Sequence, residues 1–154
     1  MLLAVFSDSH GAAERMIAAV RDASPDAAVF LGDVTPDAEA LRRAFPDLPL
    51  TVVRGNCDGD RDYPDSALFD FGGVRIFAAH GHRHGVKLSL DGFATSTLCS
   101  GAALGLFGHT HIPLHRALGG TELLNPGAIG DPHRPSFALV EAENGVFSCR
   151  ITPI

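Results

Sequence analysis

Polar side chains that bind metal ions follow five apolar segments of the chain, at the point where each segment ends. The segments read LLAVF, AAVFL, LTVV, VRIFAA and ALGLF. Each is followed within four residues by aspartate, asparagine or histidine. The set comprises two carboxylates, one amide and four imidazoles, namely Asp8, His10, Asp33, Asn56, His80, His109 and His111.

The types of these side chains predict a site for divalent transition metals. Imidazole combined with carboxylate favours Mn, Fe, Zn, Co or Ni, whereas the missing thiolates argue against a structural zinc site of the cysteine type. The seven ligands exceed the need of one tetrahedral ion and fit two ions that share a carboxylate. Asp33 is the expected bridge if the site is arranged around the central strand.

A site with two such ions indicates hydrolysis of phosphate esters. Two divalent ions contribute a charge of +4, the carboxylates of Asp8 and Asp33 contribute −2, and a bridging hydroxide leaves the site near +1. A site of positive charge attracts an anionic ligand. Paired ions roughly 3.5–4 Å apart are the usual arrangement for in-line displacement at phosphorus, because they lower the pKa of a bound water and hold the attacking oxygen.

The first half of the chain alternates apolar segments with helical patterns. The segment 13–20 places apolar residues at the spacing of one helix face. A second helix is expected with Thr35 as its N-cap and Pro36 at its first position, and it ends before Pro46. Alternation of strands with helices predicts parallel pairing. The expected strands are residues 2–7, 27–32 and 50–55.

The second half has a different pattern, in which tight turns separate apolar strands. One short helix is expected at roughly 88–98. A parallel first half and antiparallel hairpins in the second half contain too many strands for one small sheet. We therefore predict a single domain, residues 1–154, with the fold of a two-sheet α/β sandwich and flanking helices. The turns are Gly72-Gly73 within 67–81, Gly119-Gly120 within 114–125 and Asn144-Gly145 within 136–151.

The predicted fold brings the polar residues together. In open α/β sheets, ligands bind in the crevice beyond the carboxyl ends of the strands. Side chains alternate along an extended chain, so Asp8 and His10 are expected to point the same way. The same holds for His109 and His111. The spacing therefore predicts one site rather than five unrelated strand ends.

Composition and charge exclude several classes of partner. Hydrophobic residues make up 45% of the 154 residues and charged residues 19%, which is typical of a globular protein. A net charge of −6 disfavours binding of long DNA or RNA through the phosphate backbone. No stretch has the length of a signal peptide core or a membrane span. The three cysteines form no CxxC pair, so we expect a cytoplasmic protein without a membrane partner, and a homo-oligomer is left open.

The order of the motifs resembles the calcineurin-like metallophosphoesterase superfamily, and most of all its small bacterial and archaeal phosphodiesterase branch. DSH, GD, GNCD, HGH and GHTH occur in the family's order, and NPGAIG at 125–130 is similar to a turn in that branch. The resemblance implies a two-sheet α/β sandwich with a dinuclear site, for which Mn²⁺ is favoured and Ni²⁺, Fe²⁺, Co²⁺ or Zn²⁺ are alternatives. It assigns Asp8, His10, Asp33 and His111 to one ion and Asp33, Asn56, His80 and His109 to the other.

One position departs from the pattern of many relatives. They carry GNH, whose histidine contacts the phosphate and protonates the leaving group, and Cys57 stands at that position here. The general acid is left open among Cys57, Asp58 and His82. Each has a second interpretation: Cys57 as a small buried residue, Asp58 as an acceptor that orients the loop after Asn56, and His82 as a solvated loop residue.

These features together predict a metal-dependent hydrolase of small phosphodiesters. A hydroxide that bridges the two ions is expected to attack phosphorus, while the ions and histidines stabilise the added charge. Two alternatives stay open. A phosphomonoesterase or nucleotide pyrophosphatase would use the same ligands. A non-catalytic metal-binding scaffold of the same fold, like the retromer subunit of this superfamily, typically lacks part of the ligand set.

Overall fold

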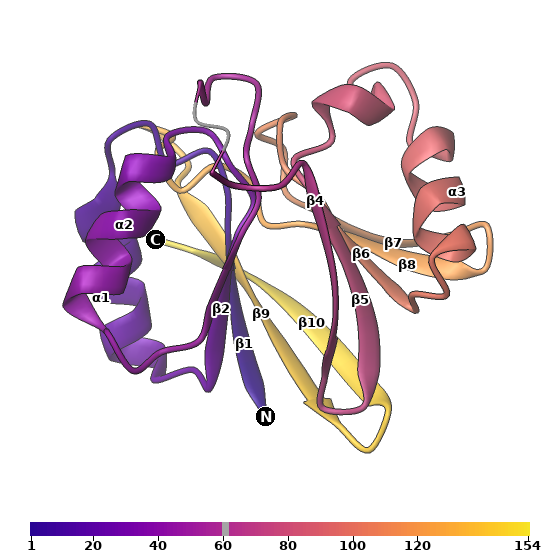
Figure 1. The fold of residues 1–154 in the computed structure, drawn as a ribbon, viewed down its shortest axis with the longest axis horizontal. Helices are drawn as coiled ribbons and strands as arrows, with labels where there is room; N and C mark the ends of the chain where they lie inside the picture. The colour runs from indigo at the N-terminus through magenta and orange to yellow at the C-terminus, as the bar shows by residue number, and fades with distance from the viewer. Residues whose placement is uncertain (60–61) are drawn as a thin grey trace.

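The computed structural model describes residues 1–59 and 62–154, which form two five-stranded sheets packed face to face (Figure 1). The first sheet has the strand order β10-β9-β1-β2-β3, and the second has the order β4-β5-β6-β8-β7. Helices α1 and α2 lie on the outer side of the first sheet, and α3 lies on the outer side of the second (Figure 1). This is the two-sheet α/β sandwich that the sequence predicts.

The first sheet is built around three parallel strands from the N-terminal third of the chain. β1 pairs with β2 and β2 pairs with β3 in parallel, and α1 and α2 connect them. The C-terminal hairpin of β9 and β10 closes the other edge of β1, with β9 antiparallel to it. The bounds are Leu2–Phe6 (β1), Ala13–Ala23 (α1), Ala27–Phe30 (β2), Thr35–Ala44 (α2), Leu50–Val52 (β3), Ser136–Glu143 (β9) and Val146–Pro153 (β10).

The second sheet also has a parallel centre, which the hairpin signals alone do not indicate. All three expected hairpins form at their predicted turns. Within this sheet, however, β5, β6 and β8 pair in parallel, and β4 and β7 lie antiparallel at the two edges. The bounds are Ser66–Phe71 (β4), Val74–Ala79 (β5), His82–His84 (a short 3₁₀ helix, η1), Asp91–Cys99 (α3), Leu104–Leu106 (β6), Leu114–Leu118 (β7) and Thr121–Asn125 (β8).

Both faces of the central strands are buried, which explains why their sequences are continuous apolar runs. Leu3 and Val5 of β1 pack between the two sheets. Ala4 and Phe6, on the other face of the same strand, pack against α1 and α2. A third cluster around Phe93 fills the space between α3 and the second sheet. The rigid layers therefore leave the strand ends as the place where polar side chains gather.

Two expected helix boundaries differ from the structure. The N-cap of α2 is Val34, in the left-handed region at φ 78°, so Thr35 is the first helical residue and not the cap. The Asp58 carboxylate, from a loop far along the chain, accepts the N–H groups of Val34 and Thr35 at 2.9 and 2.8 Å. These bonds replace the local cap that the sequence suggests. Helix α3 begins at Asp91, later than expected, because η1 and a turn occupy the preceding residues.

None of the helices within residues 1–59 and 62–154 is both long enough and apolar enough to span a bilayer.

The loops after β2 and β3 touch each other through two glycines. A Cβ atom on Gly32 would lie 2.4 Å from the backbone nitrogen of Gly55, closer than real Cβ contacts permit. Gly32 also has a φ of +99°. The loops that carry Asp33 and Asn56 can therefore approach this closely only because no side chain stands between them.

Replacement of Gly32 by alanine tests this contact. Gly32→Ala is expected to destabilise the protein by about 2–5 kcal/mol, the sum of a left-handed backbone cost and a steric overlap. Gly11→Ala is the matched control, because Gly11 has a similar φ of +93° with open space around it. Its expected cost is about 1–2 kcal/mol. Urea unfolding in the presence of a chelator measures the free energy of unfolding of both variants. An equal loss of stability in the two variants would show that the Gly32–Gly55 contact does not matter.

Candidate metal centre

The seven predicted ligands all lie in the segments that follow the carboxyl ends of five strands. Asp8 and His10 do direct their ligand atoms to the same place, as predicted, but not for the predicted reason, because these residues are not extended. Positive φ angles re-aim the side chains into a common space that simple alternation along a strand would not give. The residues concerned are Asp8 (54°), His10 (44°), Asp33 (63°), His109 (65°) and His111 (61°).

The Asp8 carboxylate is fully buried, and its two oxygens differ in the hydrogen bonds that they accept from the described residues. Its Oδ2 accepts hydrogen bonds from the Ser7 hydroxyl at 2.6 Å and from the His109 N–H at 3.0 Å. Its Oδ1 is buried and receives no hydrogen bond from the described residues. That oxygen lies 3.1 Å from His111 Nε2 and 3.8 Å from His80 Nε2. Asp8 thus presents one free oxygen between two imidazoles.

Asp33, also buried, divides its two oxygens between different histidines. Oδ1 accepts the Cys57 N–H at 2.9 Å and lies 3.5 Å from His80 Nε2. Oδ2 lies 3.9 Å from His10 Nε2. Burial alone would raise the pKa of Asp33, but the Cys57 N–H and the nearby His80 and His10 outweigh it, and the pKa is lowered. Asp33 is therefore held as a carboxylate between the two sides of the site.

The tautomer of His80 follows from its partners. Its Nδ1 lies 2.8 Å from the Leu31 carbonyl, which accepts the N–H of that nitrogen. In the neutral ring, Nε2 then carries a lone pair, and it faces Asn56 Oδ1 at 3.0 Å as well as the two carboxylates. Lone pairs that converge in this way repel one another unless a cation lies among them.

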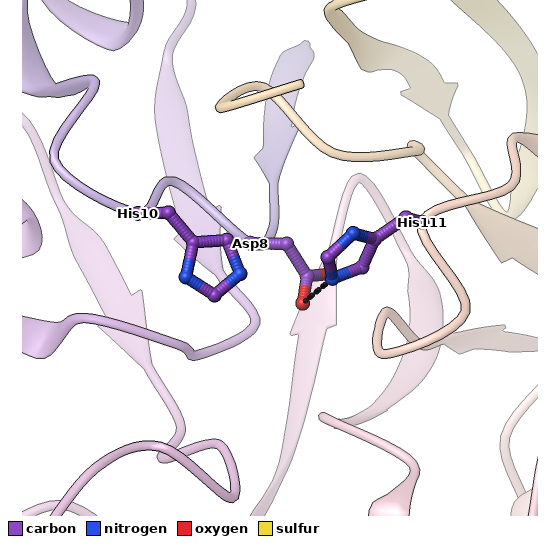
Figure 2. Close-up of side chains that lie close together, drawn as sticks. All are labelled: Asp8, His10 and His111. Carbon is purple, nitrogen blue, oxygen red and sulfur yellow. Dashed lines mark ion pairs between the residues drawn. The ribbon is translucent and has the colours of Figure 1, made fainter. Parts of the chain in front are cut away.

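Two groups of ligand atoms result, and Asp8 belongs to both. Asp8, His10 and His111 form one group, and Asp8, Asp33 and His80 form the other, each with its ligand atoms within 4.8 Å of one another. Figure 2 shows His10 and His111 on either side of the Asp8 carboxylate, and their ring centroids are 5.4 Å apart. The first group is partly exposed and the second is buried.

His109 lies beside the buried group rather than within it. Its ring centroid is 5.1 Å from that of His80, and its backbone N–H is bound to Asp8. Burial, and then the charges of His80 and Lys87, lower the pKa of His109. The ring is therefore kept in the neutral form that metal ions bind.

The residues present fit divalent metal ions. They offer carboxylate oxygen and imidazole nitrogen, the ligand types of Mn, Fe, Co, Ni and Zn sites. A buried carboxylate oxygen without a partner is costly unless a cation compensates it. The buried Oδ1 of Asp8, which accepts no hydrogen bond from the described residues, meets this description.

The three residues considered for acid catalysis lie in different positions. The ring of His82 is 5.4 Å from His80 and 6.1 Å from His109. Burial, and then the charges of His80 and Arg83, lower the pKa of His82. Cys57 is exposed, so its interpretation as a small buried residue is wrong. Desolvation, and then the neighbouring Asp33, raise the pKa of the Cys57 thiol.

Asp58 is occupied by backbone groups rather than directed at the site. Its carboxylate accepts four N–H groups, from Gly55 and Asp33 at 2.7 and 3.0 Å and from the first residues of α2. It joins the loop after β2 to the loop after β3. The contacts therefore agree with the interpretation in which Asp58 orients the loop, and not with a role as general acid.

Two further residues that position the ligands carry no metal-binding signal in the sequence. Asp37 of α2 accepts the Ser9 hydroxyl and the Gly11 N–H, both at 2.7 Å, and so holds the DSH loop. Asn125 donates its Nδ2–H groups to the Gly108 carbonyl and the Thr110 hydroxyl, both at 3.0 Å, and so holds the GHTH loop. Asn125 lies in the NPGAIG motif, and that motif is the only sequence signal for either residue.

Comparison with solved structures places this fold among known ones. A predicted phosphoesterase from Streptococcus pneumoniae superposes with a TM-score of 0.83, at 27% identity over 99% of this chain and 88% of that chain. Vps29 from Entamoeba histolytica, solved in complex with zinc, superposes with a TM-score of 0.79 at 20% identity over 99% of both chains. At that identity, the second likeness shows the fold alone.

Sequence comparison identifies the family. The probable metallophosphoesterase YsnB of Bacillus subtilis is 35% identical over 97% of this chain and 89% of its own length. A probable metallophosphoesterase of Mycoplasma pneumoniae is 30% identical over 85% of this chain and 80% of its own length. The profile of the calcineurin-like phosphoesterase superfamily domain matches residues 1–145. With its motifs on the strand ends and a match of this extent, the chain belongs to the calcineurin-like phosphoesterase superfamily.

Proposed function

We propose that this chain is a phosphodiesterase that hydrolyses small phosphodiesters with two divalent ions, of which Mn²⁺ is favoured. The observation that carries the proposal is the buried Oδ1 of Asp8, which accepts no hydrogen bond from the described residues and faces His111 on one side and His80 on the other. Asp8 also belongs to both groups of ligand atoms, which supports two cations rather than one. The ions, when bound, polarise the phosphoryl group and lower the pKa of a water.

The predicted ligands fall into two sets, one for each proposed ion. His10 and His111 belong to the exposed group, and Asn56, His80 and His109 belong to the buried side. Asp33 has one oxygen toward each side, in keeping with its predicted role as the bridge. Asp8, which the family pattern assigns to one ion, is a second shared carboxylate.

The exposed side of the centre is where a substrate would approach. The side chains of His10 and His111 are 38% and 43% exposed, whereas those of Asp8 and His80 are fully buried. A phosphodiester can therefore reach the outer group from solvent, while the buried carboxylates keep the ions in place. This arrangement supports small substrates of varied shape.

Asp8→Asn tests the metal centre directly. Asparagine retains an acceptor for Ser7 and His109 but removes the charge. In the wild type, Mn²⁺ at a hundred times its Kd is expected to stabilise the fold by about 2.7 kcal/mol. The variant is expected to lose most of this gain, to be at least as stable as the wild type without metal, and to lose turnover of bis(p-nitrophenyl) phosphate by about a hundredfold or more.

Asp70→Asn, at an exposed position of β4, is the control for Asp8→Asn and should change neither property. Metal-dependent stabilisation that survives in Asp8→Asn would rule out the centre. Tight metal binding without turnover of any phosphoester would instead favour the non-catalytic scaffold, and faster turnover of monoesters than of diesters would favour the phosphomonoesterase.

The leaving group gives a second prediction. Burial and neighbouring charges lower the pKa of His82, so this ring is mostly neutral at pH 7, and the raised pKa of the Cys57 thiol makes it a weak proton donor. Esters with a phenolate leaving group need little protonation, whereas alkoxides need it. Aryl phosphodiesters are therefore expected to turn over faster than alkyl ones by about a hundredfold or more. Equal rates in a matched pair of thymidine diesters would show that an efficient general acid is present.

Asp58→Asn separates a positioning role from acid catalysis. Loss of two of the four backbone hydrogen bonds is expected to reduce stability by about 1–3 kcal/mol and metal affinity by about tenfold to a hundredfold. At saturating metal, kcat should fall by the same factor for aryl and alkyl diesters. A loss confined to alkyl diesters would instead identify Asp58 as the proton donor.

A further inference from the structure

Three charged residues from separate segments form an ion-pair cluster at the rim of the metal centre. Asp65, immediately before β4, places its Oδ1 2.7 Å from Arg54 Nε and its Oδ2 3.1 Å from Arg83 Nη1. Arg54 follows β3 of the first sheet, and Arg83 lies in η1 after β5 of the second. One carboxylate faces two guanidinium groups, so the cluster carries a net charge of +1.

The cluster adjoins the buried side of the metal centre. Asp65 precedes Ser66, which pairs across the strands with Ala79, and Ala79 precedes the ligand His80. Arg83 follows His82, whose ring is 5.4 Å from that of His80. Arg54 stands two residues before Asn56 along the chain. The excess positive charge therefore lies next to the ligands and not elsewhere on the surface.

Lys87, the single lysine of the sequence, adds a second positive charge on the side of the metal centre where Arg83 lies. The loop after His80 folds back on itself, because the N–H groups of His84 and Val86 reach the Gly81 carbonyl at 3.0 and 3.5 Å. A Cβ atom on Gly81 would lie 2.9 Å from the Val86 side chain. Lys87, which is exposed and follows Val86, is thereby held near the ring of His109, whose pKa its charge helps to lower.

Arg54, Arg83 and Lys87 are together called the basic rim. Some of their N–H groups remain available to bind a ligand. The Arg83 side chain is 59% exposed, and the contact that it makes with Asp65 Oδ2 is through Nη1. Lys87 makes no ion pair among the described residues of the chain. Arg54, at 22% exposed, is the less accessible of the two arginines on Asp65. In a chain of net charge −6, such a concentration of free cationic donors is suited to an anionic group.

We propose that Arg83 and Lys87, backed by Arg54, bind a second phosphate of the substrate, one that is not hydrolysed. This rests on the proposed function and narrows its substrate class to phosphodiesters that carry an additional phosphate group, as in a nucleoside 5′-phosphodiester with a 3′-phosphate. Contacts to a group remote from the reacting phosphorus are formed in the ground state as well as in the transition state. They therefore lower KM more than they raise kcat.

The test compares two substrates that differ only in that phosphate: thymidine 5′-(p-nitrophenyl phosphate) with and without a 3′-phosphate. The Mn²⁺-loaded wild type is expected to have a KM about tenfold lower for the phosphorylated substrate, the value of one exposed charge-assisted contact. Arg83→Ala and Lys87→Ala should each remove most of this preference and leave the KM for the other substrate unchanged. Equal KM values in the wild type, or variants that lower kcat for both substrates alike, would overturn the proposal.

Arg75→Ala is the matched control, because Arg75 lies on β5, the strand that leads to η1, is 52% exposed, and is paired with Asp70 near the hairpin turn, at the end of the strand away from His80. A loss of preference in this variant would show a general effect of charge and would also overturn the proposal.

Calorimetry provides a readout that does not depend on turnover. Thymidine 3′,5′-bisphosphate is expected to bind the Mn²⁺-loaded wild type about tenfold more tightly than thymidine 5′-monophosphate, and Arg83→Ala should abolish the difference. If the nitrophenyl esters are not hydrolysed but the bisphosphate binds in this way, the proposed phosphodiesterase activity fails while the anion site stands. If both nucleotides bind equally, the anion site fails whatever the activity.

Discussion

A buried carboxylate with one oxygen left unsatisfied is the constraint on which the rest of this structure depends. Asp8 lies in the interior, where an uncompensated negative charge is strongly unfavourable. The protein offers hydrogen bonds to Oδ2 and none, among the described residues, to Oδ1. A cation between Oδ1 and the neighbouring imidazoles would supply the missing compensation. The surrounding imidazoles supply further ligands to such a cation, so the electrostatic need and the ligand set agree.

The positions of the ligands depend on backbone conformation as much as on residue type. Five of the seven ligands have positive φ angles, a conformation that costs about a kcal/mol or more for residues with a Cβ. Such strain persists only where surrounding contacts hold it. Here Asp58 accepts four backbone N–H groups, Asp37 accepts one backbone N–H and the Ser9 hydroxyl, and Asn125 donates to one backbone carbonyl and the Thr110 hydroxyl. The loops that carry the predicted ligands are thus held by polar residues outside the predicted ligand set.

Much of the fold, and the set of candidate ligands that gather at the strand ends, can be predicted from the sequence, for physical reasons. Buried strands are continuous apolar runs, tight hairpins carry their own turn residues, and the family's order of motifs names the candidate ligands. What the sequence does not predict depends on contacts between distant segments. The role of Asp58 arises from N–H groups more than twenty residues away along the chain. The shared position of Asp8 depends on how the two sheets meet, and the parallel centre of the second sheet depends on which strand of each hairpin lies inside.

The position of β9 has a consequence for the order in which this protein matures. β1 leads to Asp8, and it is flanked on one side by β2 and on the other by β9, whose residues follow those of β1 by more than 130 positions. During synthesis, the edge of β1 that β9 covers therefore stays unpaired until residues 136–143 have left the ribosome. All seven predicted ligands precede residue 112, so they are synthesised before the strand that completes the sheet around Asp8. The final spacing of these side chains is accordingly reached only after β9 has docked on β1.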